Sequence, residues 1–218
     1  ILHQLAGEKD KASRITNFDQ DISIALLPIP EEFSDSSHFN SALASALMNN
    51  PTLSTDPHAK STRGGKQSGE LAILDNPVVT RFVTTLDNFL REYLISLKLR
   101  PDHPHYKTIP KHYGLDCWST ILRSEGYQLP HIHTSAWLSG VYYVQLPPEI
   151  NNRDKSHSGW IEFGGSGYNL PKHSGSLRLI APKVGNLILF PSYFLHRTVP
   201  FHSKRPRISI AFDIVPKV

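Results

Sequence analysis

The chain has 218 residues, of which 39% are hydrophobic and 19% are charged, a composition typical of one globular domain. The single cysteine, Cys117, excludes a disulfide framework and favours a reducing, cytoplasmic setting. No apolar run approaches the ~20 residues that span a bilayer, and no charged-then-apolar leader opens the sequence, so we expect no membrane partner. The net charge of +4 is spread along the chain, which does not favour a nucleic-acid partner.

The first half of the chain, residues 1–115, predicts helices. Ser36 or Ser37 can cap a short helix with one apolar stripe. A longer helix of about five turns begins with Asn76 at the N-cap and Pro77 at its first position, and its apolar residues recur at intervals of three and four. We expect this half to be a helical support within the same domain as the rest of the chain.

A polar, glycine-rich segment, residues 61–69, lies between the two helices. Its composition is unusual for the interior of a strand, so it predicts a loop. Within it, five residues could form a lid that contacts substrate, or an ordinary surface connection: Arg63, Gly64, Gly65, Lys66 and Gln67.

After residue 115 the apolar period falls to two, and glycines and prolines separate short segments. The expected strands are 117–123, 137–146, 160–163, 177–180, 186–190, 195–199 and 207–215. Many short strands without intervening helices favour an antiparallel sandwich or barrel. The predicted fold is therefore mainly β, a jelly roll (double-stranded β-helix) over residues 116–218, backed by the N-terminal helices.

A His-x-His sequence stands just before the second expected strand. In an extended chain the rings of His131 and His133 share one face, about 7 Å apart, while Ile132 faces the other way. Two imidazoles at this spacing can reach one metal ion. The simpler explanation is a pair of solvated loop histidines.

A third histidine strengthens the metal interpretation. His196 lies 65 residues downstream, at a strand end with apolar neighbours, where an unpaired ring would be costly to bury. A metal ion would satisfy it.

Eleven residues later, strict alternation places Arg207, Ser209 and Asp213 on one face of a strand whose two faces both look buried. A buried guanidinium needs an anion, and its planar fork suits a carboxylate, with the Ser209 hydroxyl as a further donor. Alternatively, Arg207 pairs with an internal acid, Asp213 or Glu162, or reaches solvent.

The sequence combines a His-x-His pair, a distal histidine and an Arg-x-Ser pair. With the segments 138–144, 185–192 and 207–212, it resembles the Fe(II)- and 2-oxoglutarate-dependent oxygenases, in particular a branch found with tetratricopeptide repeats. The resemblance covers about residues 60–215. It implies that His131 and His196 bind Fe(II), and that Arg207 and Ser209 hold the distal carboxylate of 2-oxoglutarate. It also implies a hydroxylase that consumes O2 and acts on a protein side chain or a small molecule. Because the sequence begins at Ile1, a repeat region could precede it.

The chain departs from the family pattern at one ligand position. The family places an aspartate or glutamate two residues after the first histidine, and here that residue is His133. We expect three histidine ligands, His131, His133 and His196. In the alternative, His133 lies behind the ligands and Asp213, Glu162 or water completes the site, or the site has lost catalysis and kept a metal.

Three aromatic residues are candidates for the cosubstrate pocket: Trp118, Tyr142 and Tyr143. The two tyrosines alternate faces, so one of them must point inward. A second His-x-His pair, His103 and His105, lies beside prolines and charged residues and predicts an exposed connector without metal.

Two further functions fit the same residues. A cupin-like metalloenzyme would use three histidines without 2-oxoglutarate, and Arg207 would then bind the substrate's own carboxylate. A non-catalytic interaction module would keep the jelly roll and bind a protein partner.

Overall fold

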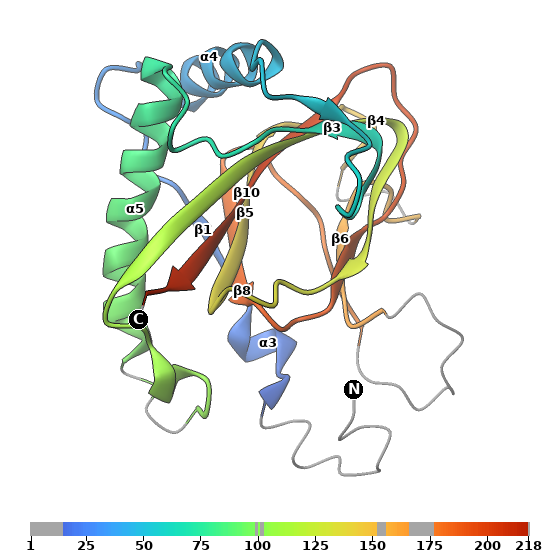
Figure 1. Cartoon of the computed structure of the whole chain (residues 1–218). Helices are drawn as coiled ribbons and strands as arrows, with labels where there is room; N and C mark the ends of the chain where they lie inside the picture. Colours follow the sequence, from blue (N-terminus) through green and yellow to red (C-terminus); the bar gives the residue numbers. More distant parts are fainter. Residues whose placement is uncertain (1–14, 99, 101–102, 152–155, 166–176, 218) are drawn as a thin grey trace.

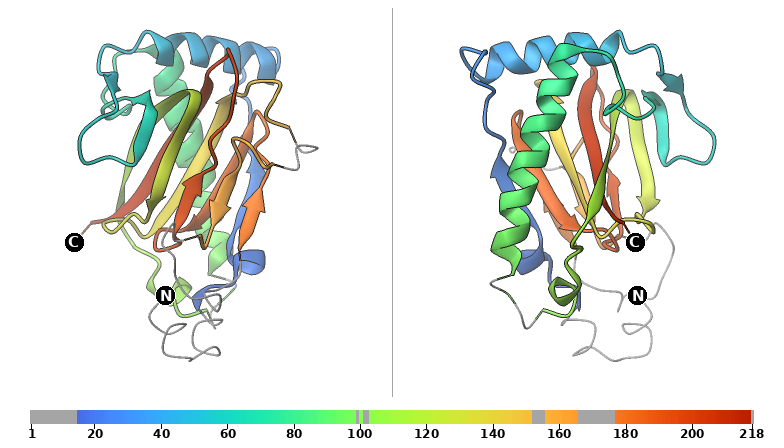
Figure 2. Two further views of the ribbon diagram at one scale, coloured as in Figure 1. Left: turned by 90° about the vertical axis from the view of Figure 1, so that its right-hand side faces the viewer. Right: turned by 60° about the vertical axis from the view of Figure 1, so that its left-hand side comes forward.

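The computed structural model of the chain describes residues 15–98, 100, 103–151, 156–165 and 177–217. A curled β-sheet forms a half-barrel, and two helices cover its outer face (Figures 1 and 2). None of the helices in the described ranges combines the length and the apolar composition that a membrane-spanning helix requires.

The described residues contain ten strands, which form one antiparallel sheet in the order β1-β8-β5-β10-β4-β9-β6-β7, and β3 pairs with both β4 and β2. The strands are β1 (Ser23–Leu26), β2 (Ser54–Thr55), β3 (Thr62–Gln67), β4 (Tyr113–His131), β5 (Leu138–Gln145), β6 (Ile161–Phe163), β7 (Arg178–Ile180), β8 (Asn186–Pro191), β9 (His196–Thr198) and β10 (Arg207–Pro216). The helices are α3 (Phe18–Asp21), α4 (Ser36–Met48), α5 (Pro77–Leu97) and the 3-10 turn η1 (Tyr106–Thr108). The mainly β architecture with helical support confirms the predicted fold class.

Strand β4 joins the two halves of the barrel. Its first part pairs with β10 from Tyr113 to Leu122, and its last part pairs with β9 at Gln128 and His131. Between these parts Glu125 has a positive φ of 63°, so the strand bends there. This bend turns the sheet around a common interior, and the sequence predicted only the central part of β4 as a strand.

Each of the two main helices begins after a residue whose side chain caps its first turn. Asn76 caps α5 by accepting hydrogen bonds from two backbone N–H groups, those of Val78 and Val79, as predicted. The predicted cap of α4 at Ser36 or Ser37 is wrong, because Asp35 accepts the backbone N–H of His38 at 2.8 Å.

The predicted loop over residues 61–69 is also wrong, since Thr62–Gln67 forms strand β3 against β4. The glycines allow the two strands to approach closely. A Cβ on Gly65 would lie 2.7 Å from the carbonyl oxygen of Ile121, and Gly64 has a positive φ of 65°. Glycine in this segment therefore indicates close backbone packing instead of a loop.

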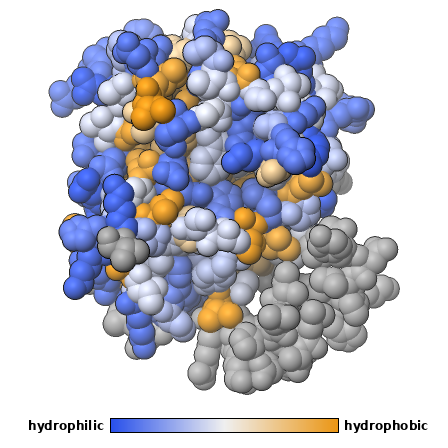
Figure 3. Space-filling model, in the orientation of Figure 1, coloured by the Kyte–Doolittle hydropathy of each residue, from blue (hydrophilic) through white to orange (hydrophobic). Residues whose placement is uncertain are grey.

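Alternation along β5 divides the core into two layers. Tyr142 and Val144 pack toward the helices with Phe82 of α5, while Val141 and Tyr143 face the barrel interior. On the face drawn in Figure 3, hydrophobic groups lie in small separate patches among hydrophilic ones.

Candidate metal centre and cosubstrate pocket

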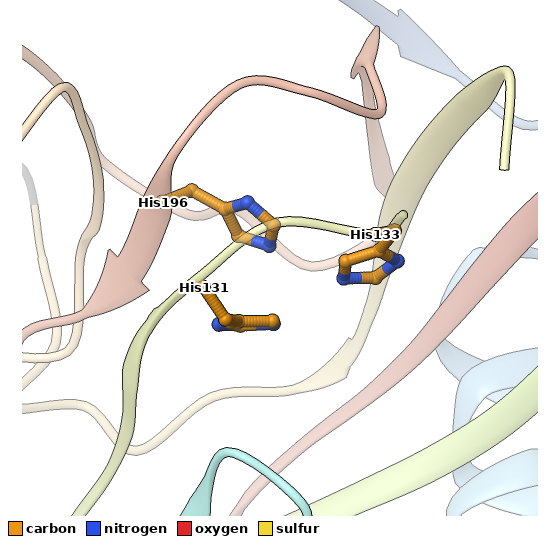
Figure 4. A group of neighbouring side chains, drawn as sticks. All are labelled: His131, His133 and His196. Carbon is orange, nitrogen blue, oxygen red and sulfur yellow. The ribbon is translucent and has the colours of Figure 1, made fainter. Parts of the chain in front are cut away.

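Three histidines meet at one end of the barrel. His131 ends β4, His196 begins β9, and the two residues are paired across these strands. His133 follows β4 after a single residue, and its backbone N–H donates to the carbonyl of Ser192 at 3.0 Å. Figure 4 shows the three rings around a shared space, and their candidate ligand nitrogens all lie within 4.8 Å of one another.

Each ring has its outer nitrogen facing an acceptor. The Nδ1 of His131 lies 2.7 Å from the carbonyl oxygen of Leu129, and that of His196 lies 2.9 Å from the carbonyl oxygen of Phe194. The Nδ1 of His133 lies 2.7 Å from Oδ1 of Asp213. When Nδ1 carries the proton, the lone pair is on Nε2, which is the arrangement of metal-binding histidines.

Burial keeps two of these rings uncharged. It lowers the pKa of His131 to about 4 and lowers the pKa of His196 well below its ordinary value. Both lone pairs are therefore available at neutral pH, and the donor set fits a divalent transition metal ion. The Ser61 hydroxyl lies 3.3 Å from Nε2 of His131.

The histidines line a cavity of about 410 Å³ in the barrel interior. One face of β10 forms part of its wall through Arg207, Ser209, Ala211 and Asp213, the face expected from the sequence. The cavity therefore connects the three imidazoles with the buried guanidinium of Arg207.

Arg207 is 1% exposed and has no carboxylate partner among the described residues. The two internal acids considered from the sequence have other partners. Glu162 accepts both hydrogen bonds of the Arg197 guanidinium at 2.7 and 2.8 Å, and Asp213 contacts His133. Burial lowers the pKa of Arg207, because the charged form is poorly solvated there. An anion in the cavity would stabilise it.

Several polar atoms around Arg207 also lack partners within the described part of the chain. They are Nε of Arg207, the Tyr143 hydroxyl and the Thr120 hydroxyl. The guanidinium lies 5.0 Å from the centre of the Tyr143 ring, and its Nη1 donates to the Ser209 hydroxyl at 3.2 Å. Native proteins rarely leave so many buried polar groups unpaired, so this end of the cavity fits a polar ligand.

The three aromatic candidates lie on two different sides of the sheet, as alternation along a strand requires. Tyr143 and Trp118 line the cavity, and the Trp118 ring lies 5.7 Å from that of His133. Tyr142 does not reach the cavity, because it packs on the helix side and donates its hydroxyl to Asn40 at 2.9 Å.

Of the five glycine-rich candidates, only Gln67 lines this cavity. Lys66 points to the other side of β3, and the Arg63 guanidinium donates to the backbone carbonyl oxygens of Lys60 and Thr62. Gly64 and Gly65 pack against β4. Lys66 and Gln67 are adjacent on β3, so their side chains point to opposite faces, and an irregularity between Arg63 and Gly65 interrupts the alternation before them.

The predicted exposed connector at the second histidine pair is wrong. His103 is only 10% exposed in its side chain, and its Nε2 lies 3.1 Å from Oδ2 of the buried Asp21. His105 stacks on Trp137 with a centroid distance of 4.5 Å. Asp21 lies more than 80 residues earlier, so local composition gave no sign of these contacts.

Thr120 lines the pocket although the sequence did not predict it, and Asp213 had no definite predicted role. Alternation from the inward Trp118 could have identified Thr120 two residues later. Asp213 was placed on the correct face, but its contact with His133 depends on a turn whose shape the spacing does not determine.

Residues 116–213 match a protein-family model described as "Putative 2OG-Fe(II) oxygenase". The expected resemblance to 2-oxoglutarate oxygenases is confirmed for this part of the chain, and the association with tetratricopeptide repeats stays a prediction. No curated protein matches the sequence.

The chain is also similar to solved structures of 2-oxoglutarate oxygenases. A Pseudomonas putida prolyl-4-hydroxylase has a TM-score of 0.61 and 14% identity, with 95% of this chain and 99% of that chain covered. A Trichoplax adhaerens prolyl hydroxylase, solved with a hypoxia inducible factor peptide, has a TM-score of 0.62 and 14% identity, covering 97% and 92%. HygX from Streptomyces hygroscopicus, solved with nickel and 2-oxoglutarate, has a TM-score of 0.58 and 15% identity, covering 92% and 85%. These similarities confirm the jelly-roll fold.

Proposed function

We propose that the chain is an Fe(II)- and 2-oxoglutarate-dependent oxygenase. His131, His133 and His196 would hold the iron, and Arg207 with Ser209 would bind the distal carboxylate of 2-oxoglutarate. The family match over the β core supports the class of enzyme, and the geometry of this chain supports the assignment of individual residues.

The observation that carries the proposal is the buried, carboxylate-free guanidinium of Arg207 in the same cavity as the three imidazoles. An arginine fork binds a carboxylate through two parallel hydrogen bonds. The unpaired hydroxyls of Thr120 and Tyr143 would add donors to the same anion. A dicarboxylate whose other end chelates the metal would satisfy both ends of the cavity.

With iron, 2-oxoglutarate and O2 bound, the site would couple decarboxylation of 2-oxoglutarate to succinate with oxidation of a substrate C–H bond. The residues of this chain fix the geometry for that chemistry. Arg207 and Ser209 orient the cosubstrate, and the hydrogen bonds at Nδ1 keep each Nε2 aimed inward. Val141 and Phe190 give the cavity apolar walls that exclude water.

We propose hydroxylation of a protein side chain or a small molecule as the reaction. The solvent side of the cavity carries the exposed residues Lys60, Ile132 and Thr134, which a substrate would meet first. Gln67 would contact the bound molecules from β3. An N-terminal repeat region, if the full protein has one, would favour a protein substrate.

The test measures binding of 2-oxoglutarate to the Fe(II)-loaded protein in the absence of oxygen. The readout is the visible charge-transfer band of the iron complex with 2-oxoglutarate. Arg207→Met should weaken 2-oxoglutarate binding by about 10- to 100-fold, because it removes charge-assisted hydrogen bonds. Affinity for Fe(II) in the absence of 2-oxoglutarate should change less than about threefold, since Arg207 belongs to the other end of the cavity.

Arg205→Met is the matched control, because Arg205 is exposed and lies outside this cavity. It should leave the band unchanged. A metal-loaded wild-type protein that gives no band with 2-oxoglutarate would contradict the proposal. If that protein still oxidised a substrate, the cupin-like alternative would replace it, and if it bound only a protein partner, the non-catalytic alternative would.

A further inference from the structure

The three histidines differ in the charge of the group behind them. Two rings face neutral backbone carbonyls, those of Leu129 and Phe194. The ring of His133 faces the carboxylate of Asp213, with 2.7 Å between Nδ1 and Oδ1. His133 is therefore the one member of the cluster that contacts a carboxylate within the described residues.

Asp213 is fixed in place by the sheet. It lies on β10 between Ser139 of β5 and Asp116 of β4, and the Ser139 hydroxyl donates to the same Oδ1 at 2.6 Å. The side chains of Asp213 and His133 are 14% and 10% exposed, and Ser139 is fully buried. No lysine or arginine of the described chain pairs with this carboxylate, so its charge is directed at the imidazole.

A divalent metal held by three neutral imidazoles would keep its full +2 charge in a largely buried site. A carboxylate hydrogen-bonded to a ligating imidazole offsets part of that charge, because it makes the ring a stronger electron donor and fixes its tautomer. The contact between Asp213 and His133 has this geometry.

We propose that Asp213 is a positioning residue of the metal centre that acts through His133, supplying the negative charge that the three ligands lack. The inference rests on the proposed function in that His133 must bind the metal. The carboxylate would then offset part of the charge of a dication held by three neutral imidazoles.

The experiment measures binding of Co(II) and Zn(II), with the visible d–d spectrum of Co(II) as a second readout. Asp213→Asn keeps the size of the side chain and removes its charge. It should weaken metal binding by about 10- to 100-fold, the effect typical of such partners, and it should change the Co(II) spectrum. Ser139→Ala keeps the charge but releases the carboxylate, and should weaken binding by a smaller factor, about 3- to 10-fold.

Asp116→Asn is the matched control. Asp116 is exposed and pairs with Asp213 in the sheet, but it has no contact with the histidines. The substitution removes the same negative charge as Asp213→Asn. Its variant should bind both metals within about twofold of the wild type. Circular dichroism should give the same folded signal for all variants, and Ser139→Ala carries the test if Asp213→Asn does not fold.

A double-mutant cycle decides whether Asp213 acts through the ring. In a His133→Ala background, Asp213→Asn should change metal affinity less than about threefold, because the connecting imidazole is absent. Equal losses in both backgrounds would overturn the inference in favour of a general charge effect. A folded Asp213→Asn protein with wild-type affinity and spectrum would also overturn it, while leaving the 2-oxoglutarate test intact. A wild-type protein that binds neither metal would overturn this inference and the proposed function together.

Discussion

Two pairs of histidines with the same spacing lie in very different surroundings in this protein. The rings of His131 and His133 are 5.1 Å apart and tilted by 26°, and both contact the ring of His196. The rings of His103 and His105 are 6.5 Å apart and almost perpendicular. The first pair therefore shares one space, whereas the second pair does not.

The two pairs also use opposite nitrogens for structural contacts. In the first pair Nδ1 faces an acceptor of the protein, and Nε2 faces the cavity, where the Ser61 hydroxyl lies 3.3 Å from Nε2 of His131. In the second pair Nε2 is occupied, by Asp21 for His103 and by the carbonyl of Trp137 for His105. A His-x-His spacing thus permits a metal site, but the hydrogen bonds around the rings and a third ligand decide whether one forms.

The largest expected effect concerns the third ligand. His196→Ala should weaken Co(II) or Zn(II) binding by more than about 100-fold, because even residues behind the ligands typically contribute 10- to 100-fold. His103→Ala should leave metal affinity within about twofold. Metal titration monitored by the Co(II) spectrum measures both. Equal losses of metal affinity in the two variants would contradict the distinction between a metal-binding and a structural histidine pair.

A second prediction tests the structural role of the other pair. Asp21 is fully buried in its side chain and contacts Arg100 at 2.8 Å and His103 at 3.1 Å. Asp21→Asn should destabilise the fold by about 2 to 3 kcal/mol, lowering Tm by roughly 4–12 °C, without changing metal affinity. Asp19→Asn is the control, since its ion pair with Arg178 is exposed and should contribute less than about 1 kcal/mol. A metal affinity that falls together with Tm would contradict the separation of the two sites.

The smallest effect, counted per pH unit, is on the pH dependence of stability of the metal-free protein. Burial lowers the pKa of both His131 and His105 to about 4 from an ordinary value of 6.5. The unfolded chain therefore binds more protons between pH 6.5 and 4, and stability is lost as the pH falls through this window. Each histidine contributes up to about 1.4 kcal/mol per pH unit.

Denaturant titrations from pH 7 to pH 4 measure this slope. His131→Gln and His105→Gln should each reduce it. At pH 7, excess Zn(II) should then stabilise His105→Gln as much as the wild type, and His131→Gln far less. Unchanged slopes in both variants would show that neither ring is responsible.

The sequence predicted the regular features of the fold well. Helix α5 began at its predicted cap, Asn76, because a capping side chain and a proline at the first position act locally. Most of the strands after residue 115 followed from their period of two. The segment from Thr62 to Gln67 was missed, because glycine is common in loops and its use for close strand packing depends on β4.

The residues of the candidate site that lie on regular strands could be predicted from the sequence, because alternation decides which face of the strand each side chain occupies. Arg207 and Ser209 lie on one face of β10, as the alternation predicted, and His131 and His196 meet because β4 and β9 pair. For Tyr142 and Tyr143, alternation required one to face inward, and only the assembled sheet decided that it is Tyr143.

The amino-acid sequence by itself determined the mainly β class, and it predicted the candidate histidines and the inward face of Arg207, because these depend on residue type and short-range spacing. Only the tertiary structure decided which acids were already paired, Glu162 with Arg197 and Asp213 with His133. Partners 35 and 80 residues apart are joined by the closure of the barrel, and no local pattern specifies them.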